Sequence, residues 1–174
     1  MSMMLERAFK GHKYLSSGLV VLALMVSLLF AIKALCLIDR SSLWGDELRT
    51  VIKAFQPSVP FIFDYLKTDS HPPLYYLMLW GWGQSVGQSA ISLRLFSWLA
   101  YLVGGILMTT QAAGLARRRG RAVALAALLA FCTPFPVRFS IEGKGYALLV
   151  AMLALALLIR RLILDRASFR LTLN

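Results

Sequence analysis

Two polar segments of this chain combine residue types that could carry acid–base chemistry. The first contains the adjacent acids Asp46 and Glu47, in the string Leu-Trp-Gly-Asp-Glu-Leu, and then Asp69 and His71, in the string Asp-Ser-His-Pro-Pro-Leu-Tyr-Tyr. A carboxylate can take a proton from an attacking hydroxyl group, and histidine changes its protonation near neutral pH. Five of the chain's eight acidic residues lie between positions 39 and 69, so this segment is the first candidate for a site.

The second segment reads Arg-Phe-Ser-Ile-Glu-Gly-Lys-Gly-Tyr and contributes Arg138, Glu142, Lys144 and Tyr146. Its cations could stabilise a phosphate leaving group if the two segments converge. A structural alternative remains open, in which Glu142 only pairs with Lys144 or Arg138 at a membrane surface.

An oxygen-rich cluster is also the type of site that holds Mg²⁺ or Mn²⁺. A divalent cation is therefore a candidate cofactor. The candidate ligands are the acids of both segments, namely Asp46, Glu47, Asp69 and Glu142.

The acids of the first segment have structural interpretations as well. Asp46 could cap a helix over residues 48–55, with Glu47 opposing the helix dipole in the first turn. Asp69 or Ser70 could cap the following helix, with a proline at its first position. Capping does not exclude catalysis, because a carboxylate fixed at a helix start is also a preorganised base.

The elements that position these segments are predicted to be membrane helices. The chain has 174 residues, of which 59% are hydrophobic and 16% charged, a composition too apolar for an ordinary soluble surface. The sequence predicts an all-α membrane protein with about four transmembrane helices, plus juxtamembrane helices in the first outer loop. The expected spans lie over residues 14–32, 95–116, 122–137 and 145–159, the last two being short enough to need snorkelling Arg and Lys at their ends.

The basic residues predict the orientation of these spans, since short cytoplasmic segments carry an excess of Lys and Arg. Three clusters are expected on the inner face: Arg7, Lys10 and Lys13; Arg117, Arg118, Arg119 and Arg121; and Arg160, Arg161, Arg166 and Arg170. The amino terminus is then cytoplasmic in a multi-pass plasma (inner) membrane protein. The first outer loop (39–94) and the second (138–145) both lie on the outer face.

Residues 74–83 are uncharged, yet ten residues of helix cover only about 15 Å, too little for a span. Their Tyr and Trp content favours an interfacial helix in the first outer loop. A fifth span here would move the cluster at 117–121 to the outer face, against the charge rule.

The net charge of +11 does not indicate a nucleic-acid partner, because the basic residues gather at membrane boundaries, where anionic lipid head groups explain them. Cys36 and Cys132 lack metal-ligand spacing and are interpreted as packing residues. Residues 1–174 are expected to form a single membrane domain.

An anchor helix, an outer-loop Asp-Glu, an Asp-x-His-Pro-Pro-Leu-Tyr-Tyr segment and a Ser-x-Glu-x-x-x-Tyr loop follow one another in this chain. This pattern resembles the GT-C membrane glycosyltransferases, in the branch of the protein mannosyltransferase-like, aminoarabinose-transferase-like and galacturonosyltransferase-like enzymes. The resemblance extends from about residue 14 to residue 161 and covers only the amino-terminal portion of such enzymes.

The resemblance implies inverting transfer of a sugar from a polyprenyl-phosphate donor to an outer-face acceptor, which could be a lipid, a glycan or a protein. It implies that Asp46 is the catalytic base, assisted by Glu47. Relatives usually carry arginine where this chain has Lys144, which keeps the charge but loses the bidentate geometry. The residues implied in substrate binding are Asp69, His71, Arg138, Glu142, Lys144 and Tyr146.

Because relatives are several times longer, the resemblance also implies a truncated enzyme or one completed by a second chain. The alternative is a non-catalytic membrane scaffold or a subunit that binds a lipid phosphate. The membrane lipid is an expected partner under both hypotheses.

Overall fold

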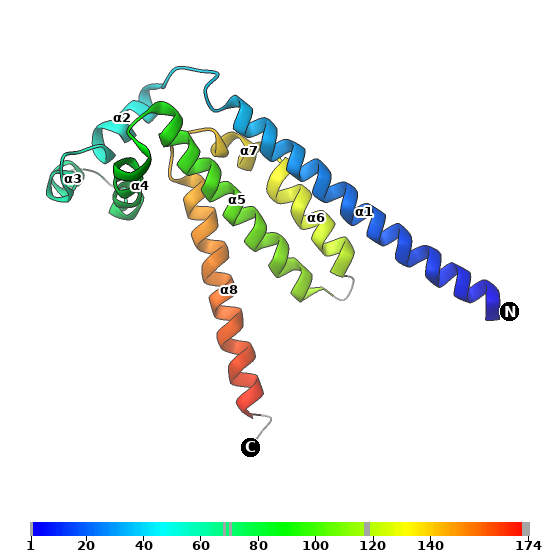
Figure 1. Ribbon diagram of the computed structural model, residues 1–174. Helices are drawn as coiled ribbons and strands as arrows, with labels where there is room; N and C mark the ends of the chain where they lie inside the picture. The colour runs from blue at the N-terminus through cyan, green and yellow to red at the C-terminus, as the bar shows by residue number, and fades with distance from the viewer. Residues whose placement is uncertain (1, 68, 70, 117–118, 172–174) are drawn as a thin grey trace.

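The computed structural model describes residues 2–67, 69, 71–116 and 119–171, and these residues fold entirely into helices and connecting segments. Three long helices, α1, α5 and α8, are separated along the chain by shorter ones (Figure 1). The elements are α1 (Ser2–Leu37), α2 (Gly45–Ala54), α3 (Val59–Leu66), α4 (Pro73–Val86), α5 (Ala90–Leu115), α6 (Arg119–Cys132), α7 (Pro134–Ser140) and α8 (Tyr146–Leu171).

Three of these helices are long and apolar enough to cross a membrane: the segments Ser17–Leu37 in α1, Ala90–Leu115 in α5 and Tyr146–Leu164 in α8. A fourth candidate exists if α6 and α7 count as one broken span, since their axes meet at 51°. The prediction of about four apolar spans is therefore confirmed to the level of three or four candidate helices, by length and composition.

Small residues let the long helices approach one another closely. Helix α5 packs between α6 and α8, and α6 packs in turn against α1. A Cβ added at Gly104 would lie 3.2 Å from the Cα of Ala151 on α8, and one at Gly105 would collide with the Phe131 ring on α6. Such Gly and Ala contacts are typical of helix packing in membranes.

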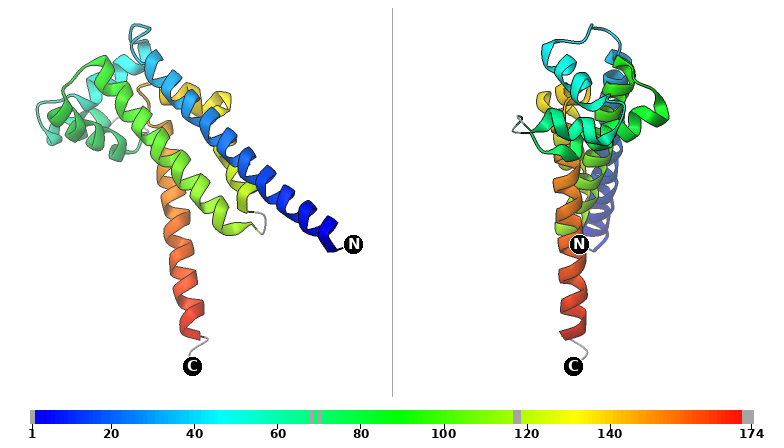
Figure 2. Two further views of the ribbon diagram at one scale, coloured as in Figure 1. Left: turned by 45° about the vertical axis from the view of Figure 1, so that its right-hand side comes forward. Right: turned by 90° about the vertical axis from the view of Figure 1, so that its left-hand side faces the viewer.

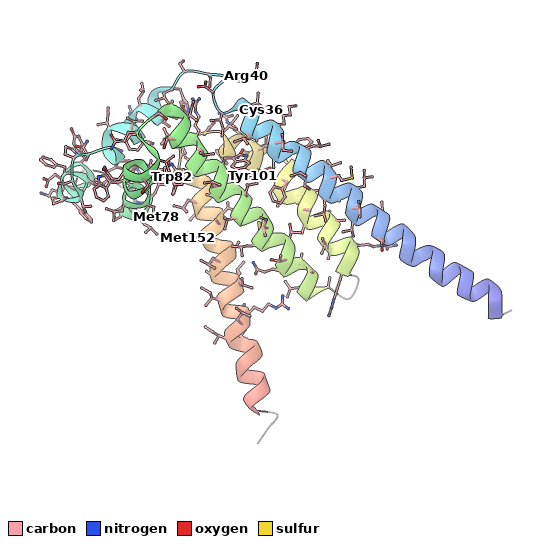
Figure 3. All side chains as sticks on the ribbon, viewed as in Figure 1. Cys36, Arg40, Met78, Trp82, Tyr101 and Met152 are labelled. Atoms are coloured by element: carbon pink, nitrogen blue, oxygen red, sulfur yellow. The ribbon has the colours of Figure 1, made fainter. Side chains whose placement is uncertain are left out.

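The outward faces of the long helices remain apolar. Leu29 on α1, Ile106 on α5 and Leu153 on α8 are all more than half exposed. Side chains project from α1 and α8 into space that no other described element occupies (Figure 3).

The bend between α6 and α7 follows from the Thr-Pro-Phe-Pro sequence. A proline lacks the N–H that would continue the helix ladder, and it pushes the preceding residue into an extended conformation. Thr133 has φ −78° and ψ 151°, and α7 starts at Pro134. The Tyr101 hydroxyl of α5 donates to the Phe131 carbonyl at 2.7 Å, which satisfies one of the carbonyls exposed by the end of α6. The predicted continuous span over 122–137 is thus broken at residue 133.

The short helices α2, α3 and α4 form a separate cluster beside the start of α5 and lie at the same end of the molecule as α7 (Figures 1 and 2). The core that they share with α5 contains Ile62, Leu79 and Leu93, which are all fully buried. The predicted interfacial helix corresponds to α4, which begins at Pro73 and extends to Val86. A proline does occupy its first position, as predicted.

Three helix boundaries differ from the predicted ones. Helix α2 starts at Gly45 with Trp44 as its N-cap, so Asp46 lies inside the first turn and is not the cap. The N-cap of α4 is Pro72 and not Asp69, while Ser70 lies outside the described residues. Arg94, placed at the end of the first outer loop by its charge, lies more than one turn inside α5.

Candidate functional site

A pocket of about 550 Å³ opens between α2, the start of α4, and the start of α8. The short link between α7 and α8 borders it, so segments from both predicted outer loops line one cavity. Three kinds of side chain line it: polar or charged (Asp46, Arg49, Thr50, Lys53, His71, Lys144), aromatic (Tyr75, Tyr76, Tyr146) and aliphatic (Pro72, Leu74, Leu148, Leu149, Met152), with Gly145 completing the lining.

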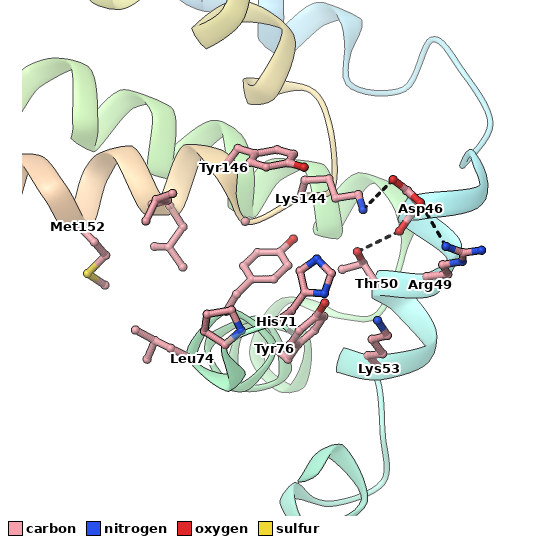
Figure 4. A pocket seen from close by; sticks show the side chains of 15 residues that line it. Asp46, Arg49, Thr50, Lys53, His71, Leu74, Tyr76, Lys144, Tyr146 and Met152 are labelled. Atoms are coloured by element: carbon pink, nitrogen blue, oxygen red, sulfur yellow. Dashed lines mark hydrogen bonds and ion pairs between the residues drawn. The ribbon is translucent and has the colours of Figure 1, made fainter. Parts of the chain in front are cut away.

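Asp46 and Lys144 form the contact that joins the two segments across the pocket. Their side-chain atoms Oδ2 and Nζ lie 3.1 Å apart, while Arg49 lies 3.8 Å from the other carboxylate oxygen. The Thr50 hydroxyl donates to the Asp46 backbone carbonyl one turn earlier in α2 (Figure 4). Asp46 thus presents a partly exposed carboxylate, held between two cations, to the cavity.

Glu47 points the opposite way, into the protein, and its relative exposure is 0%. Its carboxylate accepts two hydrogen bonds from the Arg94 guanidinium, at 2.9 and 2.7 Å, and one from the Gly143 backbone N–H at 2.7 Å. Burial alone would raise the pKa of the Glu47 carboxyl, but these hydrogen bonds outweigh it and hold the pKa below the usual value. Glu47 is therefore a buried, ionised carboxylate.

Asp69 does not line the pocket itself but binds two side chains that do, Lys53 and His71. Its carboxylate accepts from Lys53 and from the His71 ring, whose Nδ1 lies 2.5 Å away. These hydrogen bonds hold the pKa of the Asp69 carboxyl well below its usual value. Because an ionised carboxylate can only accept, the His71 Nδ1 is the donor in this hydrogen bond.

Glu142 does not line the pocket. Its carboxylate accepts from Arg138 at 2.8 Å, one helical turn earlier, which matches one of the two pairings expected in the structural alternative. Tyr146 does line the pocket, and its ring lies 4.6 Å from that of Phe139. The predicted residues of the second segment are thus divided: Lys144 and Tyr146 line the cavity, and the ion pair lies outside it.

The four acids considered as metal ligands do not converge. Asp46 pairs with Lys144, Glu47 with Arg94, Asp69 with Lys53 and Glu142 with Arg138. Among the described residues, no three His, Cys, Asp or Glu side chains form a group that could hold a metal ion. These residues therefore do not fit the shared Mg²⁺ or Mn²⁺ site that their composition suggested.

Several residues of the site were not singled out by sequence reasoning, namely Arg49, Thr50, Lys53, Tyr75 and Arg94. Arg94 had a usable signal, because it is the only charged residue between His71 and Arg117. A lone charge in such a stretch is costly unless it is paired, so it predicts a buried partner. Burial also raises the pKa of the Tyr75 hydroxyl.

No protein-family model, curated protein or solved structure matches this chain.

Proposed function

We propose that this chain is a glycosyltransferase-like membrane protein that transfers a sugar from a polyprenyl-phosphate donor to an outer-face acceptor, with inversion at the anomeric carbon. The observation that supports it is the pairing of Asp46 with Lys144 inside a cavity that is cationic at one end and apolar at the other. A lipid phosphate has the complementary chemistry, with an anionic head group and an apolar chain.

In this reaction the acceptor hydroxyl or amine attacks the anomeric carbon of the sugar, and its proton passes to the Asp46 carboxylate. The bond from that carbon to the phosphate oxygen breaks, and polyprenyl phosphate leaves with the electron pair. Lys144, Lys53 and Arg49 are the pocket cations that would stabilise the departing phosphate. No step is assigned to a metal ion, because the four acidic side chains bind separate cations.

The apolar end of the cavity would receive the first part of the polyprenyl chain. Leu148, Leu149 and Met152 line it from α8, and Leu74 lines it from the start of α4. Since α8 carries one of the three candidate spans, a chain leaving along this wall would pass directly into a surrounding bilayer. We propose that the pocket lies at the outer face of the plasma membrane, as the distribution of basic residues predicts.

A second candidate function is binding of a lipid phosphate without catalysis, as a scaffold or as a subunit whose partner chain completes an enzyme. The excess of cations over acids in the pocket favours this reading as well. The two functions differ in what they require of Asp46. Catalysis needs its basicity, whereas binding needs only the cations.

The experiment compares the wild type with Asp46→Asn in lipid nanodiscs. Binding of farnesyl phosphate, a short polyprenyl phosphate, is measured alongside sugar transfer from a labelled polyprenyl-phosphate sugar to envelope acceptors. The proposal predicts saturable binding in both proteins and a loss of transfer of roughly 100-fold or more in the variant. Binding without transfer in the wild type would favour the scaffold, and the absence of binding would count against both functions.

A further inference from the structure

Glu47, Arg94 and Gly143 form a buried clamp beneath the pocket, which we define by these three residues. Arg94 is 2% exposed, and all five of its N–H groups have an acceptor. Two bind the Glu47 carboxylate, and the others bind the carbonyls of Ile38 at 2.8 Å, Ser41 at 2.8 Å and Ser42 at 3.1 Å. One side chain thereby fastens the end of α1, the start of α2 and α5 together.

The acceptor side of the clamp is equally complete. Oε1 of Glu47 accepts from Arg94 and from the Gly143 backbone N–H, and Oε2 accepts from Arg94 and, at 3.4 Å, from the Trp44 backbone N–H. A carboxylate offers about four lone-pair sites, so Glu47 has none left for a substrate proton or a metal ion. This occupancy argues against a direct role in the chemistry.

Two residues of the clamp are sequence neighbours of two residues of the pocket. Glu47 follows Asp46 on α2, and Gly143 precedes Lys144 on the link before α8. In the interior, the Gly143 N–H donates to the Glu47 carboxylate at 2.7 Å. In the pocket, the Lys144 and Asp46 side chains meet at 3.1 Å. The Glu47–Gly143 hydrogen bond therefore restricts the distance between Asp46 and Lys144.

Helix α5 supports the same link at two further points. The Ser97 hydroxyl donates to the Lys144 carbonyl at 3.2 Å. A Cβ added at Gly143 would lie 2.4 Å from two carbon atoms of the Leu93 side chain, so only glycine permits this approach.

We infer that Glu47 is a positioning residue, which acts with Arg94 through the Gly143 N–H to hold the second outer segment against the first and so to keep Lys144 beside Asp46. The role of Asp46 and Lys144 in this inference rests on the proposed function. The effect of the clamp on the spacing of the two segments does not depend on it.

The test measures the spacing of the segments directly. Spin labels are attached at Leu48 on α2 and Phe135 on α7, which are 47% and 71% exposed, in a background lacking Cys36 and Cys132. Pulsed electron paramagnetic resonance in nanodiscs then gives the distance distribution, at a temperature well below unfolding. Farnesyl phosphate affinity is measured on the same proteins.

The informative variant is Gly143→Ala, because the new methyl group meets Leu93 and leaves the Glu47 and Arg94 side chains untouched. The distribution should shift or broaden, and affinity should fall by about tenfold or more, as for other residues that orient a binding group. Adding Leu93→Ala removes the obstructing atoms and should restore both readouts toward those of Leu93→Ala alone. If Gly143→Ala only lowered the stability of the fold, the spacing of the segments and the affinity of the folded protein would stay unchanged.

Glu47→Gln provides a second route that does not depend on the stability of Leu93→Ala. It should disturb the spacing and the affinity together, since the single oxygen of an amide cannot accept from all four N–H groups that bind the Glu47 carboxylate. The inference is overturned if Glu47→Gln loses transfer while both readouts stay at wild-type values, because Glu47 would then act in the chemistry. It is also overturned if Gly143→Ala leaves the distance distribution unchanged. Failure of the wild type to bind farnesyl phosphate would instead contradict the proposed function, and the distances would still decide the clamp.

Discussion

Asp46 and Glu47 are adjacent acids with opposite environments. Asp46 faces the pocket and remains partly exposed, whereas Glu47 is buried and saturated with hydrogen bonds. Their positions in the first turn of α2 separate them, since successive residues on a helix point in directions about 100° apart. Sequence reasoning identified both residues but could not assign these roles, because Arg94 and Gly143 lie 47 and 96 residues further along the chain from Glu47.

Asp69 carries a residue-scale prediction about acid stability. Its folded-state pKa lies below the unfolded value, so its contribution to stability is complete above the ordinary carboxyl pKa of about 3.9 and is lost as the pH falls toward the folded value. Asp69→Asn should therefore be less stable than the wild type at pH 7. The difference in Tm should shrink as the pH is lowered from about 5 toward 3.

Asp64→Asn is the matched control for this measurement, because Asp64 and its partner Lys67 are both exposed. Its substitution should change the free energy of unfolding by less than about 0.5 kcal/mol across the series. A stability difference for Asp69→Asn that stays constant between pH 7 and 3 would contradict the assigned hydrogen bonds.

At the scale of the elements, the broken pair α6–α7 depends on a contact from its neighbour. The Tyr101 hydroxyl satisfies the Phe131 carbonyl at the end of α6. Tyr101→Phe should lower the free energy of unfolding by about 1 kcal/mol, because it leaves this buried carbonyl without its donor. Thermal unfolding in one detergent measures the effect.

Tyr65→Phe removes the same hydroxyl group from an exposed position on α3 and serves as the control. It should leave stability within about 0.5 kcal/mol of the wild type. Equal stabilities for the two variants would show that the Tyr101 contact does not support the bend.

The apolar runs predicted the long helices well, but two of the predicted limits were wrong. Arg94 was taken as the end of a loop, whereas its pairing with Glu47 lets α5 start at Ala90. Uncharged residues from Ala122 to Val137 suggested one span, and Pro134 divides it. The sequence pattern of apolar residues predicts that a helix is present, whereas the position at which the helix begins or ends in this protein depends on contacts with residues distant in the sequence.

At the scale of the whole molecule, α1, α5, α6 and α8 alternate in direction (Figure 1). The amino-terminal end of α1 and the carboxy-terminal end of α8 lie away from the pocket, which is lined by α2, the start of α4, the α7–α8 link and the start of α8. Residues 117 and 118 of the predicted inner cluster lie outside the described residues. The predicted topology put both polar segments on one face, so that they could converge. The separate pairing of their acids was not predicted, because it depends on side-chain geometry.

This arrangement leads to a prediction about sidedness, which we test with single cysteines in a background lacking Cys36 and Cys132. A cysteine at Leu48 should react with a membrane-impermeant thiol reagent in intact cells. A cysteine at Arg119, which begins α6, should react only after the membrane is permeabilised. Labelling at position 119 in intact cells would contradict the proposed orientation.

The clamp also sets an order in time. During synthesis Glu47 emerges first, Arg94 follows 47 residues later, and Gly143 only 96 residues after Glu47. At translation rates of about 5–20 residues per second, roughly 5–20 s separate the two ends of the Glu47–Gly143 hydrogen bond. Helices α1 to α7 are therefore synthesised before Lys144 can reach Asp46, so the pocket closes only after these helices have been made.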